Sequence, residues 1–283
     1  MLPAWFNQYM VLLNMSHLHG TEQNKLYHRA KPHYEFAQNH HGAKFNPIAF
    51  HQVHPPLNFS RRAVQRVPWS AYRVLSDVPE SFDWRESGMV SPVLTQGTCN
   101  SCYAFTAADN LNYWTKKMTG SFGVSAQTLM DCTQGCGGGL MEDVFHWQGP
   151  YGSKQLYDGN AHTCHKPHHG IYATDYVTLS DLQGARVEPV LANAVVRYGP
   201  IPVGIDATSS RFITYNGGVI TSQECNHQPN HAVTVVGYTP EYWIIKNSWG
   251  KDWGDHGYGK IARGEDVCGI DSYASFVTAA SWR

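Results

Sequence analysis

An α+β fold with two lobes is predicted for this 283-residue chain by the order of its patterns. Small and apolar residues recur at helical spacing after residue 100, whereas short segments rich in Val, Ile and Tyr dominate after residue 200. Helices followed by strands are typical of α+β proteins, in which the two kinds of element form separate layers. A cleft between two such lobes is a natural place for a binding site.

The first helix is expected from Cys102 to Met118, because small and apolar residues follow a helical period there and Gly120 ends it. Ser101 is a plausible N-cap, so Cys102 would lie in the first turn, where the helix dipole favours a thiolate. Two further helices are expected at 140–148 and 189–198, each followed by a Gly-Pro pair. The expected strands are 201–207, 231–238, 242–246, 258–262 and 273–277.

Composition and charge exclude several classes of protein. The chain is long enough to bury a sizeable core, and 42% of its residues are hydrophobic. Its net charge of −1 argues against nucleic acid as a main partner. No stretch approaches the roughly 18 uncharged apolar residues of a membrane span. We expect a monomer that binds neither nucleic acid nor a membrane.

The composition of the sequence changes near residues 76–80, where a His-rich segment without clear patterns ends. This change predicts two parts, a leader (residues 1–77) and a body (residues 78–283). The leader has eight Lys or Arg against three Asp or Glu, and the body has thirteen against nineteen. Opposite charges favour docking of the leader onto the body. Eight of the sixteen His residues lie in the leader, so we expect acid to weaken that docking.

The first twenty residues do not form a convincing signal peptide. The apolar run at residues 9–13 has neither a basic segment before it nor a small-residue cleavage site after it. The cysteine pattern nevertheless favours an oxidising compartment. We therefore expect a lysosomal or secreted protein whose natural N-terminus is missing or misassigned here.

Seven cysteines leave one thiol over if the others form disulfides. Cys99-x-x-Cys102 could be a redox or zinc pair, but neither a second such pair nor the His spacing of a zinc site accompanies it. Six remaining cysteines allow fifteen pairings, and the sequence alone does not choose among them.

The residues needed for thiol hydrolysis occur in a suitable order. Cys102 is expected at a helix start, with the side-chain amide of Gln96 six residues before it as a donor for an oxyanion. His231 and Asn247 follow 129 and 145 residues after Cys102, close to the range of about 130 to 150 residues seen in papain-type enzymes. This spacing is compatible with Cys102 on one lobe and His231 on the other.

In its motifs the body resembles the papain and cathepsin L-like family of cysteine peptidases over essentially all of residues 78–283. The matching segments are 82–85 (FDWR), 96–105 (QGTCNSCYAF), 125–132, 135–139, 230–232 (NHA), 247–254 (NSWGKDWG) and 268–270 (CGI). The resemblance implies a helical N-terminal lobe, an antiparallel β-barrel-like C-terminal lobe and an active-site cleft between them.

The resemblance also implies the roles of the catalytic residues. Cys102 and His231 would form a thiolate-imidazolium pair, and Gln96 with the Cys102 backbone would form the oxyanion hole. Asn247 would orient His231, and Trp249 would shield the bond between them from water. The implied disulfides are Cys99 to Cys136, Cys132 to Cys164 and Cys225 to Cys268, which leave Cys102 free. Neither a cofactor nor a metal is implied.

Substrates would be proteins and peptides. By resemblance, the pocket for the P2 side chain, the second residue on the N-terminal side of the cut bond, comprises Leu140, Met141, Gly204, Ala232 and Tyr273. These residues predict an apolar P2 preference. The other implied substrate-binding residues are Gly138, Gly139, Asn230 and Trp249. The leader would act as an intramolecular inhibitor, although its match to cathepsin pro-segments is loose.

Two positions depart from the family pattern, Asn100 in place of the usual Gly and Tyr103 in place of the usual Trp. We expect them to alter substrate preference rather than to abolish catalysis. The alternatives are a catalytically silent papain-like binding or storage protein and a Cys-His acyltransferase on a related scaffold. His168 and His169 resemble the paired histidines of an exopeptidase loop, but no insertion accompanies them, so endopeptidase action is favoured.

Overall fold

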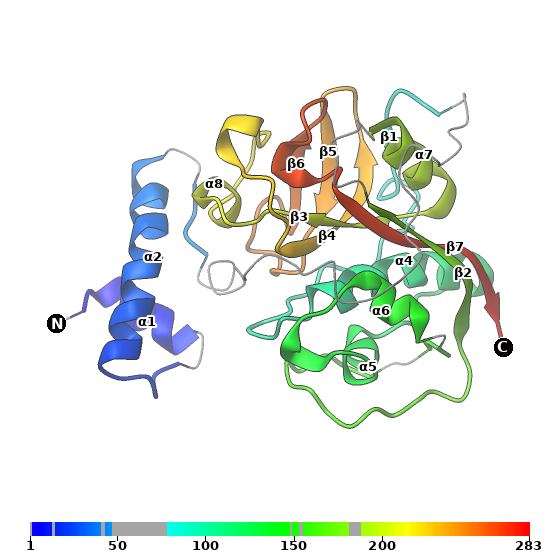
Figure 1. Cartoon of the computed structure of the whole chain (residues 1–283), viewed down its shortest axis with the longest axis horizontal. Helices are drawn as coiled ribbons and strands as arrows, with labels where there is room; N and C mark the ends of the chain where they lie inside the picture. The colour runs from blue at the N-terminus through cyan, green and yellow to red at the C-terminus, as the bar shows by residue number, and fades with distance from the viewer. Residues whose placement is uncertain are drawn as a thin grey trace.

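The computed structural model describes residues 2–12, 15–40, 43–46, 78–147, 149–152, 155–180 and 188–283. Figure 1 shows a helical lobe containing α4, α5 and α6 beside a lobe built on a large antiparallel sheet. This is the predicted α+β arrangement of two lobes. The predicted boundary at residue 77 falls at the end of segment 47–77, which lies outside the described residues.

Helix α4 (Cys102–Thr119) is the centre of the molecule. It begins at Cys102 as predicted and ends at Gly120, whose φ of 79° is favourable for glycine. Its first twelve residues are all buried, because it packs against β3, β4 and β7 on one side and against α5 and α6 on the other. The start of α4, which carries Cys102, therefore lies at the junction of the two lobes.

The remaining elements of the helical lobe are short. They are α5 (Ala126–Asp131), the 3₁₀ turn η2 (Gly135–Gly137) and α6 (Met141–His146). The Ser125 hydroxyl caps α5 by accepting from the N–H of Gln127. The predicted helix 140–148 is shorter than expected, because Leu140 is an extended N-cap and Gly149-Pro150 follows; Gln148 lies outside the described residues.

The sheet has the strand order β2-β7-β3-β4-β5-β6, with β1 paired to β4, and every pairing is antiparallel. Its strands are β1 (Phe82–Asp83), β2 (Ile171–Ser180), β3 (Ile201–Ile205), β4 (His231–Tyr238), β5 (Tyr242–Lys246), β6 (Tyr258–Ala262) and β7 (Tyr273–Trp282). The predicted bounds of β4, β5 and β6 are confirmed, β3 is two residues shorter than predicted, and β7 continues five residues further. Strand β2 was not predicted.

Helix α7 (Glu188–Tyr198) covers the sheet through contacts with β3, β4 and β7. The lobe is completed by α8 (Ser210–Ile213) and the 3₁₀ turns η3 (Ser222–Glu224) and η4 (Val267–Gly269). Buried residues of α7, α8 and the central strands form one hydrophobic core, and α4, α5 and α6 contribute to a second. Each lobe thus has its own core.

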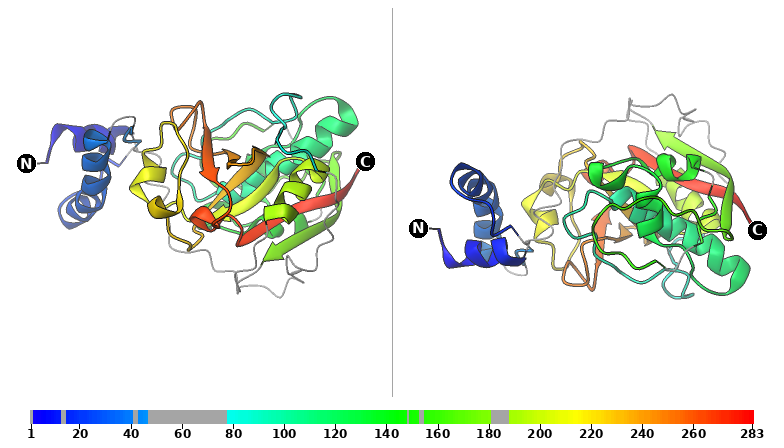
Figure 2. Two further views of the ribbon diagram at one scale, coloured as in Figure 1. Left: turned by 90° about the horizontal axis from the view of Figure 1, so that it is seen from above. Right: turned by 90° about the horizontal axis from the view of Figure 1, so that it is seen from below.

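Two helices precede the body, α1 (Ala4–Leu12) and α2 (Thr21–Asn39). Helix α2 contacts α8, and both helices lie at the opposite end of the molecule from the C-terminus (Figure 2). The N–H of Lys44 donates to the Thr214 carbonyl over 2.9 Å, and His33 Nδ1 lies 2.8 Å from Ser210 Oγ. These helices were not predicted, since α2 contains Pro32 and has few apolar residues.

Within the described part of the chain, none of the helices has the length and apolar character required to span a bilayer. The same residues contain no group of three or more His, Cys, Asp or Glu side chains arranged to hold a metal ion.

Candidate active site

Cys102 is the one cysteine outside the disulfides, and all seven cysteines lie in the described residues. The disulfides join Cys99 to Cys136, Cys132 to Cys164 and Cys225 to Cys268, which are the pairs that the family resemblance implies. The first bridge fastens the segment just before α4 to the loop near η2. It thereby holds the backbone next to Cys102 against the helical lobe.

The Cys102 thiol faces the sheet lobe. It interacts with the backbone N–H groups of Ala232, Tyr103 and Cys102 itself, all of which favour the thiolate. Burial acts in the opposite direction and is the larger effect, raising the pKa of Cys102 to about 11. The thiol in this structure is thus largely protonated at neutral pH, and a cationic partner or exposure to water is needed to ionise it.

His231, the first residue of β4, is held in one orientation by Asn247, which follows β5. The two side chains meet over 2.8 Å between His231 Nε2 and Asn247 Oδ1. Asn247 Oδ1 also accepts from the N–H of Ser248, and an amide oxygen can only accept, so Nε2 carries the hydrogen. In the neutral ring this leaves Nδ1 as the basic nitrogen.

Trp249 covers the imidazole. Its ring is stacked on His231 with centroids 4.6 Å apart, and it is 1% exposed. Phe212 packs edge-on against Trp249, and Trp253 packs against both, which fixes the position of the indole. The bond between His231 and Asn247 is therefore excluded from water, where its electrostatic strength is greater.

Gln96 is fully buried and tied to both lobes. Its Nε2 donates to the Cys99 carbonyl over 2.8 Å, and its Oε1 accepts from Ser248 Oγ over 2.6 Å. The Gln96 backbone carbonyl accepts from the hydroxyl of Tyr157 over 2.8 Å.

Tyr157 was not predicted as part of the site. Its hydroxyl also lies 2.8 Å from Ser101 Oγ, so it joins the Gln96 segment to the residue before α4. Ser101 is the N-cap residue of α4, as predicted, but its hydroxyl is directed to Tyr157 and does not bond to the first turn of the helix. The only hint in the sequence was an aromatic residue in a Gly-rich loop, which is too common to identify such a contact.

The five residues of the predicted P2 pocket come together at the interface of the lobes. Four are buried in one cluster that includes Cys102, namely Leu140, Met141, Ala232 and Tyr273. Gly204 is paired with Ala232 across β3 and β4, and a Cβ at Gly204 would touch the Tyr273 ring at 3.4 Å. Tyr273 therefore packs over Gly204 and is 0% exposed.

The other predicted substrate-binding residues lie around the same interface. A Cβ on Gly138 would lie 3.9 Å from the Cβ of Asn100, whereas one on Gly139 would press against Gln134 and Tyr103. Asn230 Oδ1 accepts from the N–H of Ala207, which fixes the chain just before His231. Gly139 therefore has no room for a side chain, and Asn100 lies beside the loop of residues 135–139, called the glycine loop below.

The buried hydroxyl of Tyr103 is hydrogen-bonded both as a donor and as an acceptor. It donates to the Gly135 carbonyl over 3.0 Å and accepts from the N–H of Gln134 over 3.2 Å. Thr133 Oγ1 lies 3.3 Å away. The residue after Cys102 is therefore bonded to the loop that leads to Gly138 and Gly139.

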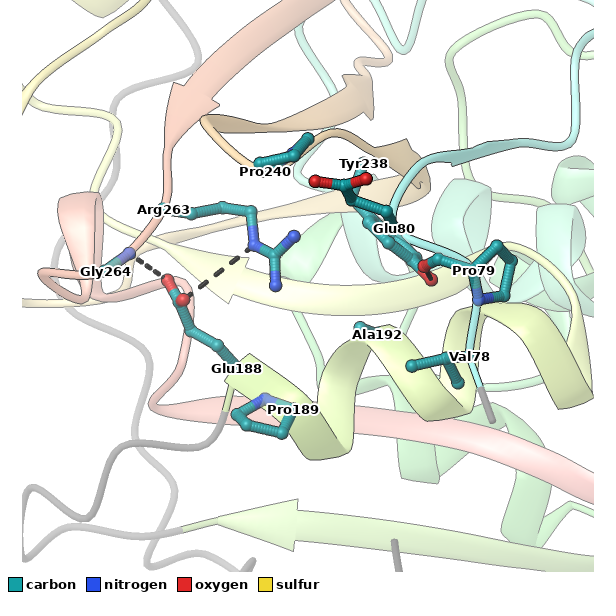
Figure 3. Close-up of a pocket in the computed structure, with 10 residues that line it drawn as sticks. All are labelled: Val78, Pro79, Glu80, Glu188, Pro189, Ala192, Tyr238, Pro240, Arg263 and Gly264. Atoms are coloured by element: carbon teal, nitrogen blue, oxygen red, sulfur yellow. Dashed lines mark hydrogen bonds and ion pairs between the residues drawn. The ribbon is translucent and has the colours of Figure 1, made fainter. Parts of the chain in front are cut away.

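One well-formed pocket lies elsewhere and contains none of the predicted site residues. Figure 3 shows this cavity of about 420 Å³, in which Glu188 of α7 reaches Gly264 and Arg263. Tyr238 and Val78 line its other side. It contains a partly buried ion pair beside the start of the body, and none of its lining residues is Cys102 or His231.

Comparisons with known proteins place most of the chain in one family. Residues 78–278 match the family described as papain family cysteine protease. Cathepsin K of Mus musculus is 36% identical over 268 residues, covering 86% of this chain and 78% of that protein. Procathepsin L of Felis catus is 35% identical over 280 residues, covering 91% and 82%. Digestive procathepsin L2 of Tenebrio molitor superposes with a TM-score of 0.74 at 28% identity, covering 97% and 99%.

Replacing Tyr103 by Phe tests the bond between α4 and the glycine loop. We expect Tyr103→Phe to lower the free energy of unfolding by about 1 kcal/mol, since the Gly135 carbonyl and Gln134 N–H lose a buried partner. Amide exchange in residues 134–139 should accelerate. Urea unfolding and hydrogen-exchange mass spectrometry measure these changes. Tyr113→Phe, on the same helix but packed against Trp84, is the control; equal exchange in both variants would contradict the assignment.

Proposed function

The chain belongs to the papain family of cysteine proteases and is a cysteine-type endopeptidase, and we propose that it cleaves peptide bonds with Cys102 as nucleophile and His231 as base. The observation that carries this assignment is the fixed tautomer of His231. Asn247 accepts the Nε2 hydrogen under the cover of Trp249, so the basic nitrogen is Nδ1. Cys102 lies beside Ala232, the next residue after His231.

In the proposed reaction Nδ1 of His231 takes the thiol proton, and the Cys102 sulfur attacks the substrate carbonyl carbon. The oxyanion accepts hydrogen bonds from the Cys102 N–H and from the side-chain amide of Gln96. The imidazolium of His231 then gives its proton to the leaving amine. A water molecule deprotonated by His231 attacks the acyl-enzyme thioester and releases the product acid.

An active-site titration tests this function against its alternatives. An epoxide inhibitor should label Cys102 stoichiometrically, and a Leu-Arg fluorogenic peptide should be cleaved. Cys102→Ala should abolish both, with activity falling roughly 10³-fold or more. A silent binding protein would not cleave the peptide, even if its thiol were labelled. An acyltransferase would be labelled and would transfer the acyl group to an added amine in preference to water.

We also propose that residues 1–77 act as an inhibitory pro-segment and that the mature body is residues 78–283. Support comes from the docking of the N-terminal helices on the body. Phe6, Tyr9 and Ala30 are buried and belong to the same hydrophobic core as the sheet lobe. The path of residues 47–77 lies outside the described residues, so the support is confined to the docking surface at α8 and Thr214.

Acid should weaken this docking. Burial and the nearby Arg29 lower the pKa of His33, whose Nδ1 contacts Ser210. Arg29 belongs to the leader itself, so the difference between docked and free leader comes from the contact of His33 with Ser210, which adds to the burial of the imidazole. Protonation therefore favours release as the pH falls through about 6.5. The affinity of the isolated leader for the body, measured by fluorescence anisotropy, should fall several-fold between pH 7.5 and 5. His33→Gln should reduce this dependence, and an affinity that does not change with pH would contradict the mechanism.

The P2 pocket should prefer Leu, Val or Phe over charged residues, because Leu140, Met141 and Ala232 offer no partner for a charge. We expect kcat/KM for a P2 Leu peptide to exceed that for a P2 Arg peptide by at least about tenfold. A positional peptide library measures the preference. Tyr273→Glu, which would place a carboxylate in the P2 pocket, should reduce the ratio of kcat/KM for the P2 Leu peptide to kcat/KM for the P2 Arg peptide. Equal turnover of both peptides by the unmodified enzyme would rule the preference out.

We propose a lysosomal or extracellular location and a monomeric state. Three disulfides support an oxidising compartment.

A further inference from the structure

The four proposed catalytic side chains lie on four separate segments of the chain. Cys102 begins α4, His231 begins β4 and Asn247 follows β5. Gln96 lies on the segment between β1 and α4. Their alignment therefore depends on contacts that hold these segments together across the boundary between the lobes.

Asp109 is a buried carboxylate on α4, seven residues and about two turns beyond Cys102. Its Oδ1 accepts from Ser91 Oγ over 2.6 Å and from Lys246 Nζ over 2.5 Å. Its Oδ2 accepts from Thr234 Oγ1 over 2.8 Å. Lys246 Nζ also donates to Ser91 Oγ over 2.9 Å, which closes the network.

Each partner of Asp109 lies on a segment that carries another catalytic residue. Ser91 is five residues before Gln96, Thr234 is three residues after His231, and Lys246 is immediately before Asn247. One carboxylate thus bonds directly to all three of the other segments. We propose that Asp109 is a positioning residue, which sets the start of α4 relative to β4, β5 and the Gln96 segment so that Cys102 meets His231.

The surroundings of this carboxylate make its bonds directional and strong. The side chains of Lys246 and Asp109 are only 6% and 10% exposed, the most buried ion pair among the residues that the structure describes. Thr234 is fully buried and Ser91 nearly so. Tyr258 at the start of β6 is the other titratable group near the carboxylate, since the charge of Asp109 contributes to raising the pKa of Tyr258. In this environment charge-assisted hydrogen bonds are stronger than in water.

Loss of stability alone would not test positioning, because removing one partner of a buried pair leaves an uncompensated charge and destabilises any protein. A suitable control is Asn112, three residues further along α4 and 5% exposed. Its amide bonds only within the helical lobe, to Gly123 and Val124. Asn112→Ala should destabilise α4 without changing how the lobes are joined.

Two variants address the proposal. Asp109→Asn removes the charge. The quadruple variant Ser91→Ala, Asp109→Leu, Thr234→Val and Lys246→Met replaces the network by apolar side chains of similar size. Such replacement of a buried ion pair is often neutral or stabilising, so this variant is expected to remain folded even if Asp109→Asn does not.

The measurement is the pH dependence of Cys102 alkylation by iodoacetamide, together with kcat/KM for a Leu-Arg peptide and thermal unfolding. A displaced α4 would separate the thiol from His231. The midpoint pH of Cys102 alkylation should therefore rise by at least about one pH unit in both variants, and the alkylation rate at pH 6 should fall about tenfold. The quadruple variant should recover thermal stability without recovering the alkylation profile. Asn112→Ala should lower thermal stability and keep the profile of the unmodified enzyme.

This inference rests on the proposed function, and the two can fail separately. If the unmodified enzyme neither reacts with the epoxide nor cleaves the peptide, the proposed function is wrong. If it does both, but a folded Asp109→Asn or quadruple variant keeps the original alkylation profile, Asp109 has no positioning role. An equal shift in Asn112→Ala would also overturn the proposal, since it would show that any loosening of α4 displaces the thiol.

Discussion

The burial of α4 between the two lobes is the constraint on which the site depends. A helix that contacts four strands and two helices has few ways to move without breaking both cores. Its first residue is Cys102, so the proposed nucleophile is placed by the packing of a helix. The disulfide from Cys99 to Cys136 and the bonds of Gln96 fix the backbone that enters this helix.

Burial has an electrostatic consequence at the thiol. A sulfur removed from water is difficult to ionise, and the backbone N–H groups around Cys102 offset this only in part. Catalysis by a thiolate therefore requires a nearby cation. In the proposed reaction His231 Nδ1 takes the thiol proton, and the imidazolium would be stabilised by Asn247 beneath Trp249. The burial that fixes the position of the sulfur is thus the reason why the proposed mechanism needs a histidine.

Polar contacts between the lobes complement the apolar packing. Apolar cores resist separation but tolerate small displacements, whereas a hydrogen bond between buried groups weakens steeply with distance and angle. Asp109, Tyr157 and Ser248 each form such bonds near the site. Apolar burial joins the lobes, and these bonds define their register.

The sequence by itself determined the fold class, the start of α4 and the bounds of β4 to β6, because these depend on local periodicity. The residues of the candidate site were proposed from the resemblance of its short motifs to one family. It did not reveal β2, whose partner strand β7 lies about a hundred residues away, nor the helices α1 and α2. Only the tertiary structure decided that the Ser101 hydroxyl turns to Tyr157, that Tyr273 packs over Gly204, and that Asp109 joins three distant segments. These contacts join residues far apart in the chain, and their partners are chosen by the packing of whole elements, which no local pattern encodes.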